Sequence, residues 1–155
     1  MLMNPIRNSI KAIIIKDNRI LCTKNKDHLG IFYLLPGGGQ RPGELMKETL
    51  KRECREEIGA DIKMGDLIYV REYIGKNHEF SEHEQNVHQI EYMFECELKE
   101  ENVQKKAISP DQWQIGIEWI NLDQFFDYRF YPKELTKFIK GKGKFFGKTY
   151  LGDIN

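Results

Sequence analysis

The sequence predicts an α/β protein of the α+β type, in which helices pack on a mixed β-sheet. Strand-like and helix-like segments follow one another without the regular alternation of a doubly wound parallel fold. Two apolar runs near the N-terminus are dense enough for a sheet that is covered on both faces. The chain has 155 residues, a length typical of one domain, so we expect residues 1–155 to form a single domain.

The first predicted elements are two strands within residues 9–25. They are joined at Asp17-Asn18, a turn pair that lies between two apolar runs. A short strand over residues 31–35 follows, and Pro36 ends it because proline has no backbone N–H for a strand ladder.

A helix is predicted over residues 44–58. Pro42 and Gly43 precede it, and Gly59 follows it as a C-terminal stop signal. At about 100° per residue, residues four apart form one apolar stripe on this helix: Met46, Leu50, Cys54 and Ile58. We expect this stripe to face the body of the protein.

The remaining elements follow from periodicity and turn signals. They are strands over residues 60–75 (with a break near Gly65), 87–98 and 115–122, helices over 122–128 and 132–140, and loops over 77–86 and 99–113. The tail, residues 141–155, is ambiguous between structured and irregular backbone.

The composition suits a folded globule, with 40% hydrophobic and 12% aromatic residues. The formal net charge is zero, which gives no bulk electrostatic reason for tight nonspecific binding to nucleic acid. Cys22, Cys54 and Cys96 are widely spaced, so we expect reduced core thiols rather than a disulfide framework or a zinc site. The sequence shows neither a signal-peptide centre nor a membrane span, and we expect a cytoplasmic protein without a membrane partner.

Three carboxylates crowd the C-terminal half of the predicted helix. Glu53 and Glu57 lie one turn apart beside the apolar stripe, and Glu56 completes the row. Carboxylates at such a boundary are partly desolvated, and a hard divalent cation would stabilise their charge. The alternative is a solvated face with ion pairs to Arg52 and Arg55, and the spacing alone leaves both interpretations open.

A run of three glycines precedes the helix. Gly37, Gly38 and Gly39 have no side chains, so their backbone amides can approach an anion closely. The spacing from Gly38 to Gly43 fits the start of a Walker phosphate loop, but Glu44 stands where that loop has lysine. The sequence therefore predicts a phosphate site without a lysine, at which metal ions meet the phosphate charge.

The whole pattern is Gly38, five residues, Glu44, seven residues, and then residues 52–60, which read RECREEIGA. It resembles the Nudix box of the Nudix (MutT-like) hydrolases, with every fixed glycine, glutamate and arginine of the box present. Cys54 and Ala60 stand where the family prefers a larger aliphatic residue. Both are apolar, so these departures concern packing rather than chemistry.

The resemblance implies the Nudix α/β/α sandwich with a mixed sheet, and hydrolysis of a nucleoside diphosphate linked to another group X. Water would attack a phosphorus atom of the pyrophosphate. Carried over position by position, the ligands of Mg²⁺ or Mn²⁺ would be Glu53, Glu56, Glu57 and the Gly38 carbonyl. Glu44 and Arg52 would brace the loop and orient the carboxylates.

The general base stays open, because its identity varies within the family. A box glutamate, Glu53 or Glu56, is favoured. The candidates outside the box are Glu91, Glu95, Glu97 and Glu118.

Further residues are predicted substrate contacts. The backbone of Gly37, Gly38 and Gly39 would meet the pyrophosphate. Tyr33 lies where relatives often carry an aromatic residue and would stack on a base, with core packing as an equal alternative. Arg71 would contact phosphate or base, although a structural role in its strand is favoured.

Two sets of basic or titratable residues lie outside the box, one of histidines and one of lysines. His78, His83 and His88 recur at intervals of five, which fits neither a helix face nor a strand face. We favour a flexible loop near the substrate over a metal cluster. The tail lysines suggest RNA contact, but a solvated tail or a dimer contact is favoured; they are Lys140, Lys142, Lys144 and Lys148.

Two functions are therefore compared. The first is a metal-dependent Nudix hydrolase acting on a small nucleotide-type diphosphate, and the intact carboxylates favour it. The second is a catalytically silent Nudix module that binds a nucleotide as a sensor. The sequence does not identify the group X, and capped RNA stays among the substrates to test.

Overall fold

A computed structural model describes residues 4–100 and 113–155 of the chain. Its strands are β1 (Arg7–Lys16), β2 (Arg19–Asp27), β3 (Gly30–Leu34), β4 (Gly37–Gly39), β5 (Ile62–Ile74), β6 (His88–Leu98), β7 (Gln114–Asn121), β8 (Ile139–Lys140), β9 (Lys144–Phe145) and β10 (Tyr150–Asp153). Its α-helices are α1 (Met46–Ile58) and α2 (Ser81–Glu84), and its 3₁₀ helices are η1 (Gly75–Asn77), η2 (Leu122–Asp127), η3 (Lys133–Lys137) and η4 (Gly141–Gly143).

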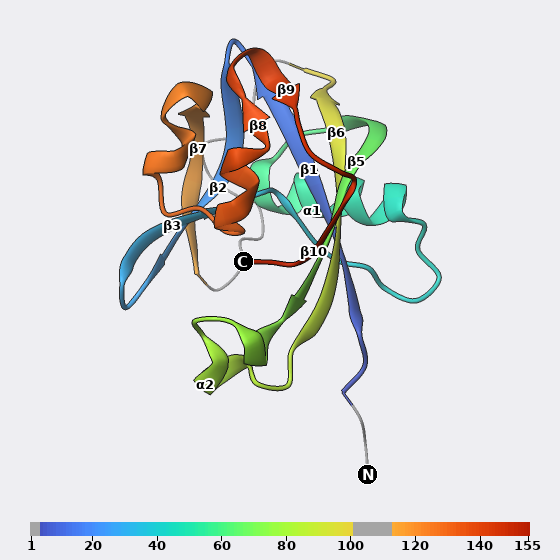
Figure 1. Cartoon of the computed structure of the whole chain (residues 1–155). Helices are drawn as coiled ribbons and strands as arrows, with labels where there is room; N and C mark the ends of the chain where they lie inside the picture. The colour runs from blue at the N-terminus through green and yellow to red at the C-terminus, as the bar shows by residue number, and fades with distance from the viewer. Residues whose placement is uncertain (1–3, 101–112) are drawn as a thin grey trace.

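The main sheet is mixed, as the sequence predicts (Figure 1). Its strand order is β10-β5-β6-β1-β2-β3, with β4 paired to β1 and β7 paired to β2. The pairs β1–β6 and β10–β5 are parallel, and the other pairs of this sheet are antiparallel. β8 and β9 form a separate small antiparallel sheet. None of the helices in residues 4–100 and 113–155 is long and apolar enough to cross a membrane.

One face of the sheet is covered by α1. The predicted stripe is confirmed, because Leu50, Cys54 and Ile58 are fully buried and pack on strand residues such as Ile10 and Ile62. At roughly 1.5–3 kcal/mol for each large aliphatic side chain that is buried, this contact fixes the helix on the sheet. The carboxylates beside the stripe are thereby fixed as well.

The opposite face is covered by the C-terminal part of the chain. Its core includes Ile13 and Met93 from the sheet, together with Phe125, Leu135 and Ile139 from η2, η3 and β8. The prediction of a sheet covered on both faces is therefore confirmed. The cysteines, one in this core and two in the core under α1, are free and buried, as expected.

The first turn and the helix show how local chemistry sets the chain path. Asp17 and Asn18 both have positive φ, 51° and 58°, which is the backbone of a tight β-hairpin turn. The helix begins at Met46 rather than at residue 44, because Leu45 is extended and the carboxylate of Glu44 accepts a hydrogen bond from the Arg41 amide. Glu44 thus belongs to the loop.

Three other predictions are corrected. The expected loop at 77–86 contains the short helix α2, and the expected helix over 132–140 is the 3₁₀ helix η3 followed by β8. The predicted helix at 122–128 is also a 3₁₀ helix. The ambiguous tail contributes β10, which pairs with β5. Most of the expected loop at 99–113 lies outside the described residues.

Candidate active site

The glycine turn meets the end of α1 at Gly37. The Gly37 amide donates to Oε2 of Glu57 over 2.9 Å, and Glu57 is only 4% exposed. Gly37 has φ 135°, and a Cβ there would lie 2.0 Å from the carbonyl oxygen of Ile10. Only glycine fits here, so the turn is held between β1 and the helix.

Arg52 connects the turn with the carboxylates. Its guanidinium bonds Glu44 with Nε and Nη2, both over 2.9 Å, and bonds Glu53 with Nη1 over 2.9 Å. Glu56 lies 3.7 Å from Nη1, and the Gly39 carbonyl accepts from Nη2 over 3.2 Å. The hydrogen bond from Arg52 lowers the pKa of Glu44 to about 2. The predicted bracing of the loop by Glu44 and Arg52 therefore has a geometric basis.

Gly38 lies directly against Glu53. A Cβ at Gly38 would come within 2.6 Å of the Glu53 carboxyl carbon, so a side chain would displace that carboxylate. Residues that are 15 positions apart thus form one surface, made of the glycine backbone and the carboxylates of α1.

The donor set suits a hard divalent cation. Carboxylates and a backbone carbonyl are oxygen ligands, which Mg²⁺ and Mn²⁺ prefer. In the part of the chain that the structure describes, no three metal-binding side chains already converge on one point. Glu53 and Glu56 lie at Arg52, and Glu57 lies at the Gly37 amide. The chemistry of the residues therefore fits a metal, and binding would require the glutamate side chains to turn.

A cationic side of the glycine turn was missed by the sequence interpretation. Nζ of Lys11 donates to the carbonyls of Leu35 and Gly37, over 3.3 Å each. The Arg7 guanidinium lies on Gly39, with Nη2 2.5 Å from the position of a Cβ there. The sequence interpretation found no lysine within this loop, whereas the structure places a lysine of β1 beside it. The available signal was a pair of basic residues at an even spacing, Arg7 and Lys11, just before a run of isoleucines.

Arg71, a predicted substrate contact, lies in a buried ion pair. Its Nε donates to Glu91 over 2.7 Å, and Nη1 donates to the Ile154 carbonyl over 2.6 Å. Arg71 and Glu91 are each 5% exposed. Glu91, a candidate general base, also accepts from Gln89 over 3.0 Å. These contacts agree with the alternative that the sequence favoured, a structural role in the strand.

Tyr33, predicted to stack on a base, lies in the core with 8% of its surface exposed. Its ring packs edge-on against Tyr128, with 5.4 Å between the ring centroids. Burial, and then the neighbouring Glu118 carboxylate, raise the pKa of Tyr33. Oε2 of Glu118 is buried and has no hydrogen-bond partner among the described residues. Glu95 and Glu97, the other candidate bases, are exposed on β6.

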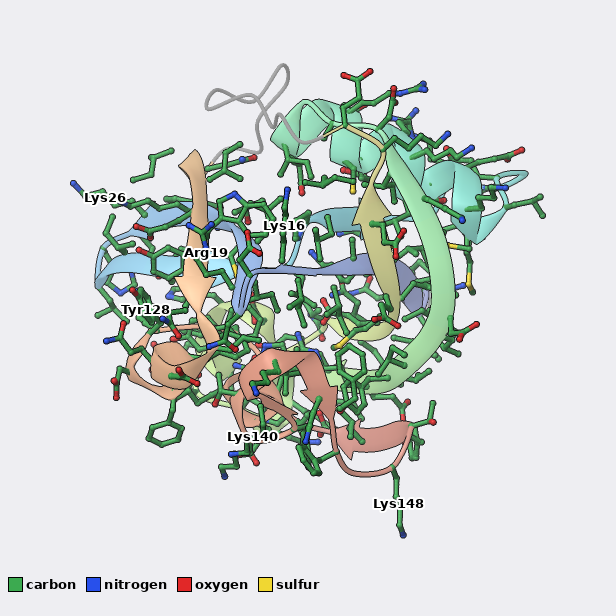
Figure 2. The ribbon with its side chains drawn as sticks, turned by 90° about the horizontal axis from the view of Figure 1, so that it is seen from above. Lys16, Arg19, Lys26, Tyr128, Lys140 and Lys148 are labelled. Atoms are coloured by element: carbon green, nitrogen blue, oxygen red, sulfur yellow. The ribbon has the colours of Figure 1, made fainter. Side chains whose placement is uncertain are left out.

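A surface cavity of about 360 Å³ opens beside this aromatic pair. It is lined by Glu79, Asp127, Tyr128, Arg129, Phe130, Tyr131 and Lys133. Arg129 is held by Asp27 through two hydrogen bonds of 2.8 Å, so its charge is already balanced. Tyr128, which is labelled in Figure 2, contacts the ring of Tyr33, and no sequence motif marked it.

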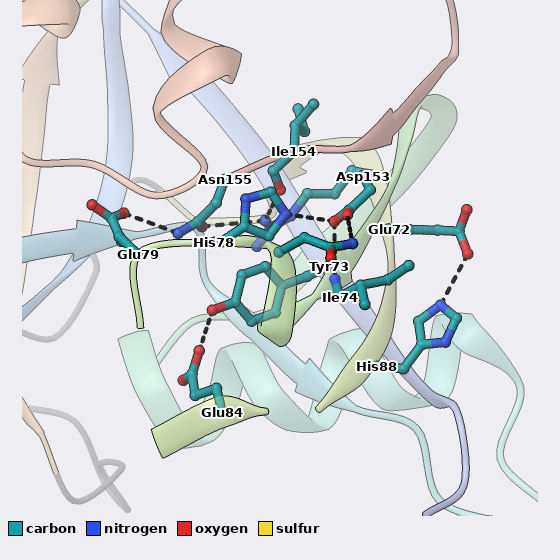
Figure 3. A network of polar contacts seen from close by, with 12 residues as sticks. Glu72, Tyr73, Ile74, His78, Glu79, Glu84, His88, Asp153, Ile154 and Asn155 are labelled. Carbon is teal, nitrogen blue, oxygen red and sulfur yellow. Dashed lines mark hydrogen bonds and ion pairs between the residues drawn. The ribbon is translucent and has the colours of Figure 1, made fainter. Parts of the chain in front are cut away.

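The three histidines do not form a cluster. His78 lies 2.5 Å from Asp153, and His88 lies 3.0 Å from Glu72 (Figure 3). Asp153 comes from β10, so the segment that was predicted to be a flexible loop is tied to the C-terminal strand.

The tail lysines are spread over the surface. Lys140 and Lys148 are both exposed and project from separate parts of the C-terminal segment (Figure 2). Phe145, which lies between them, packs partly against the core, whereas Phe146 is 50% exposed.

The family model of the NUDIX domain matches residues 5–141. The nucleoside triphosphatase NudI of Salmonella agona (strain SL483) is 38% identical over 64 residues, which cover 39% of this chain and 45% of that protein. The match thus spans about half the length of that curated relative.

Solved structures show the same fold. The MutT protein from Methanosarcina mazei Go1 has a TM-score of 0.66 at 20% identity, covering 88% of this chain and 94% of that chain. An ADP-ribose pyrophosphatase from Streptococcus suis 89-1591 has a TM-score of 0.55 at 19% identity, covering 77% and 76%. At these identities the likeness concerns the fold.

Proposed function

This chain belongs to the family of proteins with a NUDIX domain, and on that premise we propose that it is a metal-dependent hydrolase. Its substrate is a nucleoside diphosphate linked to another group, and the bond that it cleaves is the pyrophosphate bond. The proposal includes Mg²⁺ or Mn²⁺ as cofactor.

One observation carries the proposal: a single guanidinium, that of Arg52, serves three carboxylates, those of Glu44, Glu53 and Glu56. The buried carboxylate of Glu57 lies on the adjacent Gly37 amide. The site therefore carries more negative than positive charge, which favours a divalent cation over a purely structural ion-pair network.

We propose the following roles for these residues, and their contacts support them. Glu53, Glu56 and Glu57, with the Gly38 carbonyl, would hold the metal, while Arg52 orients Glu53 and Glu56 from one side. A bound divalent metal would polarise the phosphoryl oxygens and make a bound water more acidic. Glu53 or Glu56 would take the proton of the attacking water. The product is a phosphate-terminated fragment on each side of the broken bond.

The substrate class is supported by names and by shape. The similar proteins above are described as a nucleoside triphosphatase and an ADP-ribose pyrophosphatase, and both act on nucleotide phosphates. Tyr128 lines the cavity and packs against Tyr33. Tyr33 lies four residues before Gly37 in the sequence. We assign this cavity to the base or to the group X that the diphosphate carries.

The test is a substrate panel with Mg²⁺ or Mn²⁺, with products separated by chromatography. It contains ADP-ribose, nucleotide sugars, dinucleoside polyphosphates, oxidised nucleoside triphosphates and capped RNA. We expect turnover of at least one nucleoside diphosphate derivative, and loss of that turnover when EDTA removes the metal. If nothing is hydrolysed and a nucleotide binds without metal, the chain is a sensor module instead.

Glu57→Gln is the decisive variant. Glutamine still accepts the Gly37 hydrogen bond, so the fold is kept, but its side chain has no charge for a metal. We expect kcat/KM to fall by about 10³-fold, the scale seen when one electrostatic contact to a transition state is removed. Glu82→Gln, an exposed glutamate on α2, is the matched control. Full activity of Glu57→Gln would remove Glu57 from the metal site.

A further inference from the structure

The two sides of the glycine turn carry opposite charge. On the helix side, the carboxylate of Glu57 accepts from the Gly37 amide. On the other side, the ammonium of Lys11 donates to the Gly37 carbonyl. One glycine thus lies between a carboxylate and a cation that come from different elements, α1 and β1.

Lys11 and Arg7 reach the turn from β1 in a regular way. Gly37 pairs with Lys11 in the strand register, and Gly39 pairs with Ser9. Residues at every second position of a strand share one face, so Arg7 and Lys11 share a face. The two cations are therefore placed at the two ends of β4, one at Gly37 and one on Gly39.

Among residues 4–100 and 113–155, no carboxylate forms an ion pair with Arg7 or Lys11. The buried carboxylate near Lys11 is Glu91, which already bonds Arg71 over 2.7 Å. Counting these four groups, three are positive and one is negative, so this side of the turn has a positive surplus.

The contacts of Lys11 leave room for an anion. Its two hydrogen bonds go to carbonyl oxygens at 3.3 Å, which is long for a charged donor. An ammonium has three N–H donors, and two are used. A phosphate oxygen is a stronger acceptor for a lysine than a backbone carbonyl, because it carries charge.

We propose that Lys11 and Arg7 bind the phosphate oxygens of the substrate on the strand side of the glycine turn, opposite the carboxylates of α1. This inference rests on the proposed function, since it names further substrate-binding residues for the same reaction. The glycine backbone then lies between two complementary electrostatic groups. The carboxylates act through a metal, and the two cations act directly on the diphosphate.

The competing explanation is that Lys11 only braces the turn. If Lys11 only braced the turn, replacing it would lower the stability of the fold. The affinity for a phosphate ligand would then stay unchanged. A phosphate contact would change affinity for any diphosphate, including one that carries no nucleoside. Inorganic pyrophosphate therefore serves as the probe, with binding measured by calorimetry on the full chain.

The variants are Lys11→Met, Lys11→Arg and Arg7→Gln, with Lys63→Met, an exposed lysine on β5, as the control. We expect Lys11→Met to weaken pyrophosphate binding by about tenfold or more, the scale of one charge-assisted hydrogen bond. Lys11→Arg should retain most of the pyrophosphate affinity of the wild type. Arg7→Gln should weaken it by about threefold to tenfold, because Arg7 is exposed and solvent screens its charge.

The outcomes separate the inference from the proposed function. If Lys11→Met and Arg7→Gln bind pyrophosphate like the wild type, the inference is wrong, whether or not the melting temperature of Lys11→Met falls. Hydrolysis of a nucleoside diphosphate derivative by these same variants, with an unchanged KM, would leave the proposed function standing. If the wild type hydrolyses nothing while the pyrophosphate affinities still fall as expected, the anion site stands and the enzyme assignment fails.

Discussion

Two of the arginine–carboxylate systems in this molecule contrast with each other, one on α1 and one within the sheet. Arg52 has 20% of its side chain exposed and lies within 4 Å of carboxylates from three residues, Glu44, Glu53 and Glu56. Arg71 and Glu91 form a pair whose side chains are 6% and 7% exposed. Both systems contain a strong, short contact, 2.9 Å in the first and 2.7 Å in the second. They differ in balance: the first has surplus carboxylates, while the second is a closed pair.

That difference separates a site from a structural contact. A buried pair with matched charge is satisfied by itself, and removing one partner leaves an uncompensated charge in the core. An accessible group with surplus negative charge is stabilised further by any cation that binds. The same residue types therefore support the fold in one place and a reaction in the other. Glu91 stays a candidate general base only if substrate binding releases it from Arg71.

The largest expected effect tests the closed pair. Glu91→Gln should lower the free energy of unfolding by about 3–5 kcal/mol, because Arg71 keeps its charge in a buried position. The double variant Arg71→Met with Glu91→Leu should recover most of this loss, since no charge is then left unpaired. Urea denaturation of the wild type and of each variant measures both.

Activity measured on the folded fraction sharpens the same comparison. A purely structural pair predicts an unchanged KM in both the single and the double variant. A KM that rises only when Arg71 is replaced would return Arg71 to the substrate-binding residues that the sequence predicted.

The second largest effect concerns activity and tests the system on α1, in which Arg52 contacts the surplus carboxylates. Arg52→Lys should lower kcat/KM by about 10–100-fold, the range found when a residue that orients metal ligands is replaced. Lysine keeps the charge but lacks the planar fork that reaches Glu44, Glu53 and Gly39 together. The control is Arg55→Lys, which changes an exposed pair with Asp61 on the same helix. Equal kinetics for the two variants would show that Arg52 is an ordinary surface arginine.

Local patterns predicted one half of the site well. Helical period predicted the row formed by Glu53, Glu56 and Glu57, and the resemblance to the Nudix box implied that Glu44 and Arg52 brace the loop. These residues lie within one continuous stretch, and the contact of Arg52 with Glu44 gives that bracing a geometric basis. Lys11 and Arg7 reach the turn only through the pairing of β1 with β4, and such register cannot be read from one sequence without knowing the sheet order.

The elements of the fold also divide into those that local sequence patterns predict and those that depend on contacts between distant segments. The mixed sheet, the first hairpin and the helix follow from turn pairs and periodicity. The tail was ambiguous because β10 is only a four-residue strand, and its place depends on β5 and on Asp153 binding His78. The helices η2 and η3 were predicted as helices, but their 3₁₀ geometry is set by packing on the sheet rather than by residue spacing.

The smallest expected effect is the pH dependence of the stability that Glu44 contributes through its contact with Arg52. In the folded protein the hydrogen bond from Arg52 holds the pKa of Glu44 at about 2, against an ordinary value of 4.5. A carboxyl group whose pKa is lowered by folding contributes stability above its unfolded pKa, and that contribution is lost as the pH falls through the folded value. Glu44→Gln should therefore be slightly less stable than the wild type at pH 7, and the difference should shrink from about pH 4.5 downward. The difference is small because the pair is partly accessible to solvent, which screens its charges. Urea midpoints of the two proteins between pH 7 and pH 3 measure it, and a gap that stays constant over this range would mean that Glu44 acts through its loop hydrogen bond to the Arg41 amide rather than through its charge.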